Sequence, residues 1–378
     1  MTAHPRHGAP PSLRLPLAIP PAAQARVAAR LSDGWLHRYS EAGAPGPSAA
    51  ARLEVAMAGL AGRRHAVAVN SCGSAMFLAL RGAGVMPGDP VLVNAFTLGP
   101  VPGAVLHAGA RPVAVEITDD LVIDESDLAR ATRETGARVL LLSHMRGHLA
   151  DMGRLVPLAA DLGLTVIEDC AQAHGATWRG RPAGSFGACA CFSFYPTKNL
   201  GALGDGGAVV TNDTTLDAKL RRLRQYGWER KYFSSDAGGM NSRLDELQAA
   251  ILALKLRHLP AWNERRRRIA ALYQQLLAGT SLVLPATPAD GDHVFHLYVV
   301  RSRERDRLAV QLRSQGIGCD IHYPLPAYQQ PIYRQYAPHD GLPVTEQLAR
   351  EILSLPMYPE LTDAEVRFVA AAIHTPAA

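Results

Sequence analysis

The amino-acid sequence predicts an α/β fold, in which a large domain with a doubly wound, mainly parallel sheet precedes a smaller C-terminal α+β domain. Between residue 65 and about residue 230, short apolar runs alternate with amphipathic stretches, which is the rhythm of βαβ units. The runs are rich in Val, Ile and Leu, as in strands that are covered on both faces. A helical tract follows over residues 244–277 and is expected to lead into the smaller domain.

Each element is justified by its own pattern, in chain order. The apolar runs predict strands at 65–70, 90–94, 111–116, 138–143, 164–169, 188–194 and 206–212. Pro260 is expected to interrupt the long helical tract, because proline removes a helix hydrogen bond and clashes with the preceding turn. Residues 293–302 are expected to be a strand of the smaller domain. The expected segments are a Pro-rich arm over 1–22, the large domain over 23–250 and the small domain over 251–378.

The composition of the 378 residues excludes several classes of protein. With 48% hydrophobic and 19% charged positions, the chain is not intrinsically disordered, and no apolar run is long enough for a membrane span. The N-terminus lacks the continuous apolar stretch of a signal peptide, and five scattered cysteines fit a reduced, cytoplasmic protein. A net charge of +5 is too mild to indicate nucleic acid. We therefore expect no nucleic-acid or membrane partner.

The turn at 70–74 is a candidate phosphate site. Its small residues, among them Gly73 and Ser74, join a strand to a helix. A helix N-terminus presents free N–H groups and the positive end of the helix dipole, which suit a phosphate. An ordinary strand–helix turn is the alternative.

The strand-like run 164–169 ends in the carboxylate of Asp169. A carboxylate at the end of a buried strand is costly unless it meets a cation or a hydrogen-bond donor. It either caps the helix that follows or faces a bound cation, such as a protonated ring nitrogen. Gln172, three residues later, fits a capping box as well as a ligand contact.

Lys198 lies in the most informative stretch, residues 191–207, where a strand delivers Ser193 and then a Gly-rich turn. The basic residues are almost all Arg, so a lysine here is less expected as an ordinary solvated side chain. Desolvation lowers the pKa of a lysine and makes its neutral amine a nucleophile for carbonyls. A phosphate cradle, a carboxylate for a pyridinium nitrogen and this lysine are together the parts that pyridoxal phosphate needs.

Several long motifs carry a resemblance to a known family. The segments VIEDCAQAHGATWRGRPAGSFG, FSFYPTKNLGALGDGGAVVTND and GMNSRLDELQAAILALKL closely resemble the DegT/DnrJ/EryC1/StrS family of fold type I, pyridoxal-phosphate-dependent sugar aminotransferases. The C-terminal IHYPLPAYQQPIYRQY and LPVTEQLAREILSLPMYPELTDAEV also resemble it, so the likeness covers roughly residues 50–375. It implies ping-pong transfer of an amino group from L-glutamate or L-glutamine to a keto sugar linked to a nucleotide. GMNSRLDELQAA looks most like members that make 3-amino sugars.

The resemblance also implies roles for residues around the cofactor. Lys198 would form the Schiff base and move protons, Asp169 would hold the ring nitrogen, and Gln172 would approach the 3-oxygen. Ser193, with the amides at 73 and 74, would bind the phosphate. Asn241 would reach the phosphate of the neighbouring subunit's cofactor, which implies a homodimer with shared active sites.

Substrate-side residues follow from the same resemblance. Arg243, His322 and Tyr323 are expected there, although Arg243 fits a helix cap or a structural ion pair equally well. The family's H-L-Y-G segment is replaced by H-M-R-G, so His144 fits the pattern and Arg146 does not. Arg146 would pair with a carboxylate or phosphate of the substrate, or else be a surface arginine.

Three further positions depart from the family pattern. The family usually has an aromatic ring that stacks on the cofactor, directly after the Thr of P-S-x-T, and Leu98 stands at that place. Phe96 is the alternative ring, and without one the cofactor loses ~0.5–1.5 kcal/mol. Gly73 replaces a threonine and so lacks its hydroxyl, while Tyr328 stands where many relatives have a histidine near the nucleotide sugar.

Four other functions are alternatives to a nucleotide-sugar aminotransferase. An aminotransferase acting on a keto-cyclitol or another non-nucleotide acceptor stays open, as does a noncatalytic cofactor-binding homologue. A dehydratase of the same fold would replace the Schiff-base lysine by histidine, and Lys198 is present. A dinucleotide-dependent dehydrogenase is rejected because residues 82–88 lack the G-x-G-x-x-G spacing.

Overall fold

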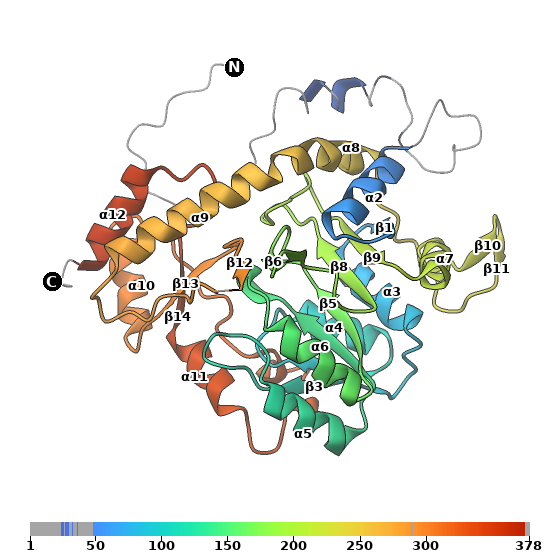
Figure 1. Ribbon diagram of the computed structural model, residues 1–378, viewed down its shortest axis with the longest axis horizontal. Helices are drawn as coiled ribbons and strands as arrows, with labels where there is room; N and C mark the ends of the chain where they lie inside the picture. Colours follow the sequence, from blue (N-terminus) through green and yellow to red (C-terminus); the bar gives the residue numbers. More distant parts are fainter. Residues whose placement is uncertain are drawn as a thin grey trace.

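A computed structural model describes residues 24–25, 27–29, 32, 36, 48–288 and 290–374, so the arm expected over 1–22 lies outside the described residues. The core is a seven-stranded sheet in the order β1-β9-β8-β5-β4-β2-β3 (Figure 1). Its strands are β1 (His65–Val69), β2 (Pro90–Asn94), β3 (Arg111–Val115), β4 (Val139–Ser143), β5 (Thr165–Asp169), β8 (Cys189–Ser193) and β9 (Gly207–Thr211).

The sheet is mainly parallel, as the sequence predicts. Strands β3, β2, β4, β5 and β8 run in one direction and pair in parallel. Strand β9 pairs antiparallel with both β8 and β1. The carboxyl ends of β4, β5 and β8 therefore meet at one edge, which is where open α/β sheets bind their ligands.

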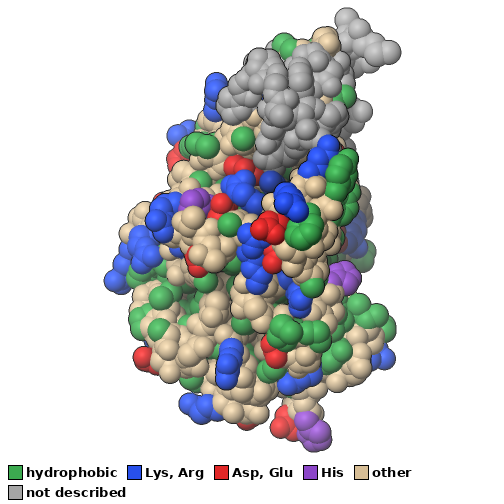
Figure 2. Space-filling view, turned by 90° about the vertical axis from the view of Figure 1, so that its right-hand side faces the viewer, with side chains coloured by type: hydrophobic (Ala, Val, Ile, Leu, Met, Phe, Trp, Pro, Cys, Tyr) green, Lys and Arg blue, Asp and Glu red, His purple; other side chains and the backbone are tan. Residues whose placement is uncertain are grey.

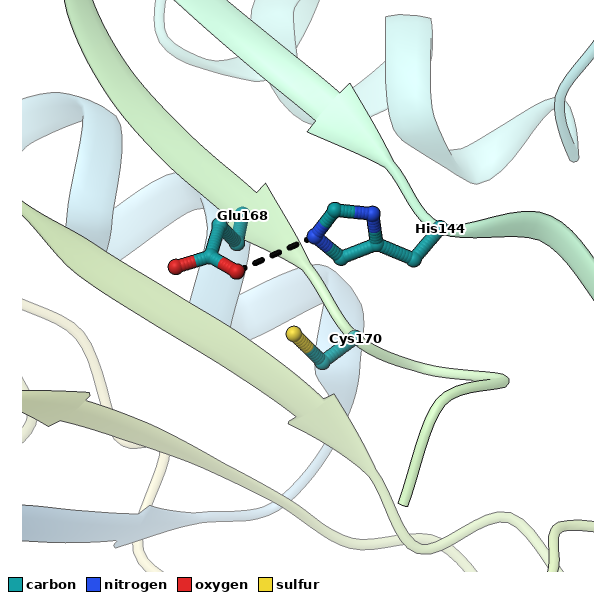
Figure 3. Close-up of side chains that lie close together, drawn as sticks. All are labelled: His144, Glu168 and Cys170. Carbon is teal, nitrogen blue, oxygen red and sulfur yellow. Dashed lines mark hydrogen bonds and ion pairs between the residues drawn. The ribbon is translucent and has the colours of Figure 1, made fainter. Parts of the chain in front are cut away.

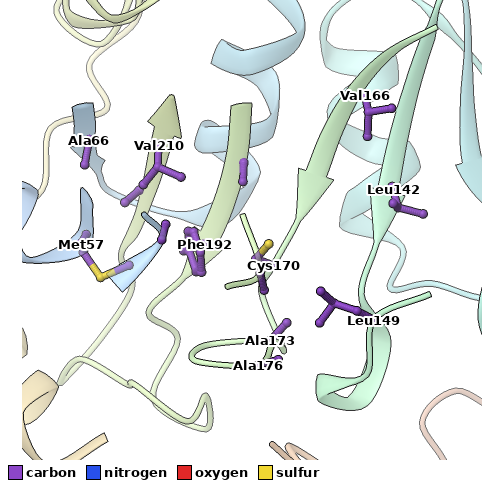
Figure 4. Close-up of a cluster of buried hydrophobic side chains, with 14 of the residues drawn as sticks. Met57, Ala66, Leu142, Leu149, Val166, Cys170, Ala173, Ala176, Phe192 and Val210 are labelled. Carbon is purple, nitrogen blue, oxygen red and sulfur yellow. The ribbon is translucent and has the colours of Figure 1, made fainter. Parts of the chain in front are cut away.

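Helices cover both faces of this sheet, because side chains alternate along each strand. Ala66 and Ala68 of β1 pack in a cluster with helices α2, α5, α6 and α8, whereas Val67 and Val69 pack with α3, α4 and α7. Figure 4 shows part of the first cluster, with Met57 of α2 beside strand side chains such as Val210. These helices are α2 (Ala49–Leu60), α3 (Cys72–Gly82), α4 (Pro100–His107), α5 (Glu125–Thr135), α6 (Met152–Asp161), α7 (Thr214–Leu223) and α8 (Glu246–Lys255).

The long helical tract is interrupted, as predicted, although the break lies just before the proline. Helix α8 is followed by a 3₁₀ turn (Leu256–His258) and then by α9 (Leu259–Leu276). Pro260 lies in the first turn of α9, where its missing N–H has no helical partner to lose. Helix α9 then runs from the sheet to the C-terminal part (Figure 1).

The C-terminal part packs around its own cluster, which contains Ile269 of α9 and Tyr298. Its elements are the antiparallel strands β13 (Tyr298–Arg301) and β14 (Ile352–Leu355) and helices α10 (Arg305–Ser314), α11 (Pro343–Glu351) and α12 (Asp363–His374). The boundary between residues 250 and 251 stays a prediction. None of the helices that the structure describes is long and apolar enough to cross a membrane.

One expected strand is shorter than its pattern indicates. Of the predicted residues 293–302, only Tyr298–Arg301 form a strand, β13. Phe295 has a left-handed backbone conformation (φ +41°) that is incompatible with a strand. The backbone of the residues before β13 pairs with the chain that follows β4 instead: the amides of Val294 and His296 donate to the carbonyls of Gly147 and Arg146.

Candidate active site

A cavity of about 690 Å³ opens at the carboxyl ends of β4, β5 and β8, beside the N-terminus of α3. It brings together most of the side chains that the sequence singles out. Of the predicted site residues, its lining includes Gly73, Leu98, His144, Asp169, Gln172, Ser193, Lys198, His322 and Tyr323.

The Asp169 carboxylate, at the last position of β5, is buried and held through both oxygens. Oδ1 accepts from the amide of Ala171 at 3.0 Å, and Oδ2 accepts from the hydroxyl of Ser143 at 2.9 Å. The Ser143 hydroxyl in turn lies 2.9 Å from that of Thr97. The helix expected after Asp169 is absent, because the residues that follow β5 form turns, so the predicted helix cap is wrong. The carboxylate accepts from an amide of the first turn and lines the cavity, whereas its contact with a cation stays a prediction.

Lys198 is 7% exposed and lies in the same cavity, after the turn that follows β8. Burial lowers the pKa of its amine, and the charge of Asp169 opposes that shift only in part. A lysine with a lowered pKa has a larger neutral fraction at neutral pH, which is what a nucleophilic amine requires.

The N-terminus of α3 lines the cavity beside Asp169 and Lys198. It contains the predicted phosphate-binding residues Gly73 and Ser74, of which the structure supports only Gly73. Ser71 caps this helix by accepting from the amide of Ser74 at 3.0 Å, so that amide is already used, and Ser74 does not line the cavity. The amides of Cys72 and Gly73 donate to no described residue, and both residues line the cavity together with Ser193. They offer the free N–H groups that a phosphate needs.

Gln172 links the cavity wall to the segment after β4. Its Oε1 accepts from the amide of Arg146 at 2.6 Å, and its Nε2 lies 3.4 Å from the hydroxyl of Tyr323. Burial, with the charge of Asp169, raises the pKa of Tyr323 to about 12, so its phenol stays protonated at neutral pH. His322, whose Nδ1 lies 2.9 Å from the hydroxyl of Ser354, lines the cavity beside it.

The two candidates for a stacking side chain are separated by the structure. Leu98 lines the cavity and is 39% exposed. Phe96 is buried, does not line the cavity, and lies in another cluster with its ring 6.3 Å from that of Tyr323. Phe96 therefore does not replace the missing ring, and the cavity wall at this point is aliphatic.

His144, Glu168 and Cys170 lie close together beneath the cavity and resemble a set of metal ligands (Figure 3). Glu168 is fully buried, and its oxygens accept from Nε2 of His144 at 3.0 Å and from three backbone amides. These amides belong to Gly184, Phe186 and Gly187. Burial raises the pKa of the Cys170 thiol well above its usual value, which keeps it protonated. His144 and Glu168 therefore form a hydrogen-bonded pair with Cys170 beside it, and the carboxylate oxygens of Glu168 already have donors in the described chain.

Four residues predicted at the substrate or partner side lie outside this cavity, and one of them, Arg146, is buried and lines a smaller cavity. Asn241 is exposed and pairs with Gln225 across an isolated bridge, and Arg243 lies over the ring of Tyr226 at 5.5 Å. Tyr328 is buried and donates to Glu346 at 3.0 Å, away from the cavity lining. For Asn241 a place outside its own subunit's cavity agrees with the predicted contact to a partner, which no described contact tests.

Several lining residues carried no sequence signal strong enough to single them out. They include Thr97, Ala171, Tyr195 and His296. Ala171 and Tyr195 each follow a strand end that the prediction already used, so their position was available from the pattern. His296 comes from the segment mistaken for a strand, and only the fold brings it to the cavity.

Comparisons with known proteins agree with this geometry. The DegT/DnrJ/EryC1/StrS aminotransferase family matches residues 22–374. A UDP-N-acetyl-3-dehydro-α-D-glucosamine 3-aminotransferase from Acidithiobacillus ferrooxidans is 44% identical over 322 residues, 85% of this chain and 86% of that one. A dTDP-3-amino-3,4,6-trideoxy-α-D-glucose transaminase from Streptomyces venezuelae is 48% identical over 299 residues, 79% of each chain. The crystal structure of DesV from S. venezuelae, with a ketimine intermediate, superposes with a TM-score of 0.87 at 44% identity and 93% coverage of both chains.

Proposed function

The chain belongs to the DegT/DnrJ/EryC1/StrS aminotransferase family, and from that premise we propose that it aminates the 3-keto position of a nucleotide-linked sugar, with L-glutamate or L-glutamine as donor and pyridoxal phosphate as cofactor. One observation carries the proposal. The buried amine of Lys198, the held carboxylate of Asp169 and the free amides at the start of α3 line one cavity. The relatives named above support the sugar and the carbon, since the name of one gives a 3-dehydro sugar carried by UDP and that of the other a 3-amino sugar carried by dTDP.

The residues present fit the cofactor on grounds of hydrogen bonding. The amides of Cys72 and Gly73 have no partner among the described residues, and Ser193 adds a hydroxyl close to the same wall. These groups would hold the phosphate. Asp169 would receive the protonated ring nitrogen. When bound, pyridoxal phosphate supplies a carbonyl for amines and a ring that withdraws electrons from the substrate.

The side chains of the chain divide the remaining work. Lys198 would bond the cofactor and then carry a proton at its Nζ, which the lowered pKa of its amine favours. Asp169 orients the ring through a carboxylate that Ser143 and the Ala171 amide keep in place. The protonated phenol of Tyr323 lies 3.4 Å from Nε2 of Gln172 and lines the cavity together with His322, so both residues are placed to orient the substrate.

We propose a homodimer that shares its active sites through the surface around Asn241. The adjoining hairpin of β10 (Trp228–Arg230) and β11 (Phe233–Ser234) exposes Tyr232 (79%) and Phe233 (48%). Figure 2 views the molecule from the side of this hairpin and shows hydrophobic side chains among basic and acidic ones. Exposed aromatic side chains with a polar rim are typical of protein interfaces.

The decisive experiment is an absorption spectrum of the purified protein before and after addition of L-glutamate or L-glutamine. We expect a yellow protein whose visible band fades with one donor and returns with a nucleotide-linked 3-keto sugar. Lys198→Ala should abolish the donor response, whereas Lys219→Ala is the matched control, because Lys219 lies on α7 and bonds the carbonyls of Arg81 and Gly82. A yellow protein that ignores both donors would instead indicate a noncatalytic homologue. Return of the band with a keto-cyclitol alone would replace the sugar in the proposal.

A further inference from the structure

Arg146 is buried in an unusual backbone conformation directly after β4. It is 6% exposed and adopts a left-handed φ of +61°, followed by Gly147 at +90°. Its amide and carbonyl are both fixed, to Gln172 Oε1 at 2.6 Å and to the amide of His296 at 2.9 Å. Backbone strain of this kind persists where the surroundings hold it, and it concentrates at binding sites.

The guanidinium of Arg146 has no counter-ion in the described part of the chain. Its Nε and Nη2 are buried without a hydrogen-bond partner, and its Cζ lies 5.7 Å over the ring of Phe96. Buried Arg266 also has an unpartnered Nε, but its Nη1 donates to the carbonyls of residues 295, 296 and 357, whereas no hydrogen bond of the Arg146 guanidinium is found within the described residues. A buried charge is costly unless it is paired, so an unpaired guanidinium indicates a partner that comes from elsewhere.

A second, smaller cavity of about 150 Å³ lies at this guanidinium. Arg146, His148, His293 and Arg301 line it, and Leu297 lines both this cavity and the larger one. The small cavity therefore adjoins the site at which the substrates are proposed to react. It is too small for a nucleoside diphosphate and large enough for a carboxylate with a few carbons.

The other ionisable groups leave one positive charge unbalanced. Arg301 is paired with Asp119 at 2.8 Å and with Glu351 at 3.1 Å. Burial lowers the pKa of His148 to about 4 and that of His293 well below its usual value, so both rings are neutral donors or acceptors. Asp120, at the cavity rim, is exposed and makes no ion pair with Arg146. A single buried guanidinium matches a monoanion better than a phosphate dianion.

We propose that this small cavity is a carboxylate-binding site whose cation is Arg146, and that it holds a carboxylate of one of the two substrates. That this carboxylate belongs to a substrate rests on the proposed function, whereas the binding of a carboxylate does not. Two sources supply this chemistry: the side-chain carboxylate of a glutamate donor, or an acid group on the acceptor sugar. A guanidinium binds either one through a charge-assisted hydrogen bond.

The test measures the melting temperature of the full-length, cofactor-loaded protein with two carboxylates. Glutarate stands for the donor and D-glucuronate for an acidic sugar; glutaramide and D-glucose are their neutral counterparts, at matched ionic strength. A ligand that binds only the folded state raises the melting temperature, and we expect a saturable rise of about 2 °C or more with one carboxylate. The stronger response identifies the source.

Three variants make the result specific to the guanidinium. Arg146→Met should lose the rise and melt no lower than the wild type without ligand, because the variant removes a buried unpaired charge. Arg146→Lys should keep a weakened rise, since it retains the charge without the fork. Arg307→Met, at an exposed arginine of α10 paired with Glu304, should respond like the wild type.

Four outcomes would overturn the proposal. They are a wild type that responds to neither carboxylate, an Arg146→Met variant that keeps the rise, an Arg146→Met variant that melts as low as Arg266→Met, and an Arg146→Met variant whose dimer dissociates. The third would make the guanidinium purely structural, and the fourth would assign its counter-ion to a second copy of the chain. The melting temperature can be measured without turnover. If the wild-type protein shows the carboxylate-dependent rise but transfers no amino group, the result therefore counts against the proposed function alone.

Discussion

Ser143 and Asp169 lie directly opposite each other at the ends of two neighbouring parallel strands, and the serine hydroxyl donates to the carboxylate at 2.9 Å. The orientation of Asp169 is thus set by β4 as well as by its own strand. Asn94 of β2 fixes the backbone of Ser143 in turn, accepting from its amide at 2.9 Å. Three adjacent strands therefore determine where one carboxylate oxygen points.

Ser143→Ala removes the hydrogen bond to Oδ2 of Asp169 and leaves only the Ala171 amide on the other oxygen. A hydrogen bond to a charged group contributes about 1.5–3 kcal/mol, so we expect cofactor affinity to fall about tenfold or more. Equilibrium dialysis against pyridoxal phosphate measures this. Ser143→Thr keeps a hydroxyl and is the matched control; equal affinity in Ala, Thr and wild type would show that Asp169 needs no support from β4.

Leu98→Phe restores a ring at the aliphatic wall of the cavity. Leu98 is 39% exposed and lines open space, so the larger side chain has room. An aromatic pair adds about 0.5–1.5 kcal/mol beyond burial, which predicts a dissociation constant for pyridoxal phosphate lower by about two- to tenfold. Leu98→Met, similar in volume but without a ring, should leave the constant unchanged. An equal gain in both variants would mean that bulk, not stacking, limits binding.

The chemistry-bearing strand ends were predictable from sequence, whereas the residues that follow them were less so. Asp169 and Ser193 end strands whose apolar patterns are unambiguous, so their place at one edge of the sheet follows from the fold class. Strand alternation would place Phe96 on the same side as Leu98, but the chain leaves β2 at Asn94 and alternation no longer applies. The burial of Arg146 was not predictable for a similar reason, because Arg146 has a left-handed backbone conformation that the alternation of a strand does not describe.

Ser74 shows a different limit of sequence reasoning. The amide of Ser74 was predicted to bind the phosphate because it lies at a helix N-terminus. That amide instead donates to the hydroxyl of Ser71, which caps the helix. The signal was present, since a serine at position 71 stands three residues before Ser74 and is a typical N-cap. No sequence pattern, by contrast, shows that a second cavity adjoins the first, since its walls come from four separate segments of the chain.

Gly73→Thr supplies the hydroxyl that relatives of this family carry at the phosphate turn. A Cβ built at Gly73 meets only the Ser71 hydroxyl, at 3.8 Å, and the position has no left-handed φ, so the substitution fits without strain. One further hydrogen bond to the charged phosphate predicts tighter cofactor binding by about 1.5 kcal/mol or more, which is about tenfold. Gly73→Val, equal in shape without the hydroxyl, is the control in the same dialysis measurement. Tighter binding in Val as well would assign the gain to packing.

Glu168→Gln should destabilise the fold without any involvement of a metal. Both carboxylate oxygens of Glu168 accept hydrogen bonds, from His144 and from three backbone amides. In glutamine an NH₂ group replaces one of these oxygens, and it would face donors with which it cannot form hydrogen bonds. We expect a loss of about 3 kcal/mol or more in the free energy of unfolding by urea. Addition of zinc or a chelator should leave the wild-type transition unchanged. A chelator that lowers it would show that His144, Glu168 and Cys170 hold a metal after all.

Buried His174 predicts a loss of stability in acid. Neither ring nitrogen makes a well-formed hydrogen bond with a described residue, the backbone of Ser193 opposes the lowering of the pKa only in part, and the ring packs 5.3 Å from that of Phe192. Burial, with the charge of Lys198, lowers the pKa of His174 to about 3. The unfolded chain, where a histidine has a pKa of about 6.5, then binds a proton that the folded chain does not, so the stability is complete above pH 6.5 and falls as the pH drops toward 3. At pH 5 this one group costs about 2 kcal/mol.

His174→Phe replaces the titrating ring by an apolar one of similar shape and should flatten the pH dependence of the free energy of unfolding between pH 6.5 and 4. Urea titrations of the apoprotein at several pH values measure that slope. His339→Phe is the control, because His339 is fully exposed and bonded only to Asp340, and it should keep the wild-type slope. If His174→Phe also kept it, the proton uptake would belong to other buried histidines, of which His296 is the next, since burial and the charge of Lys198 lower its pKa as well.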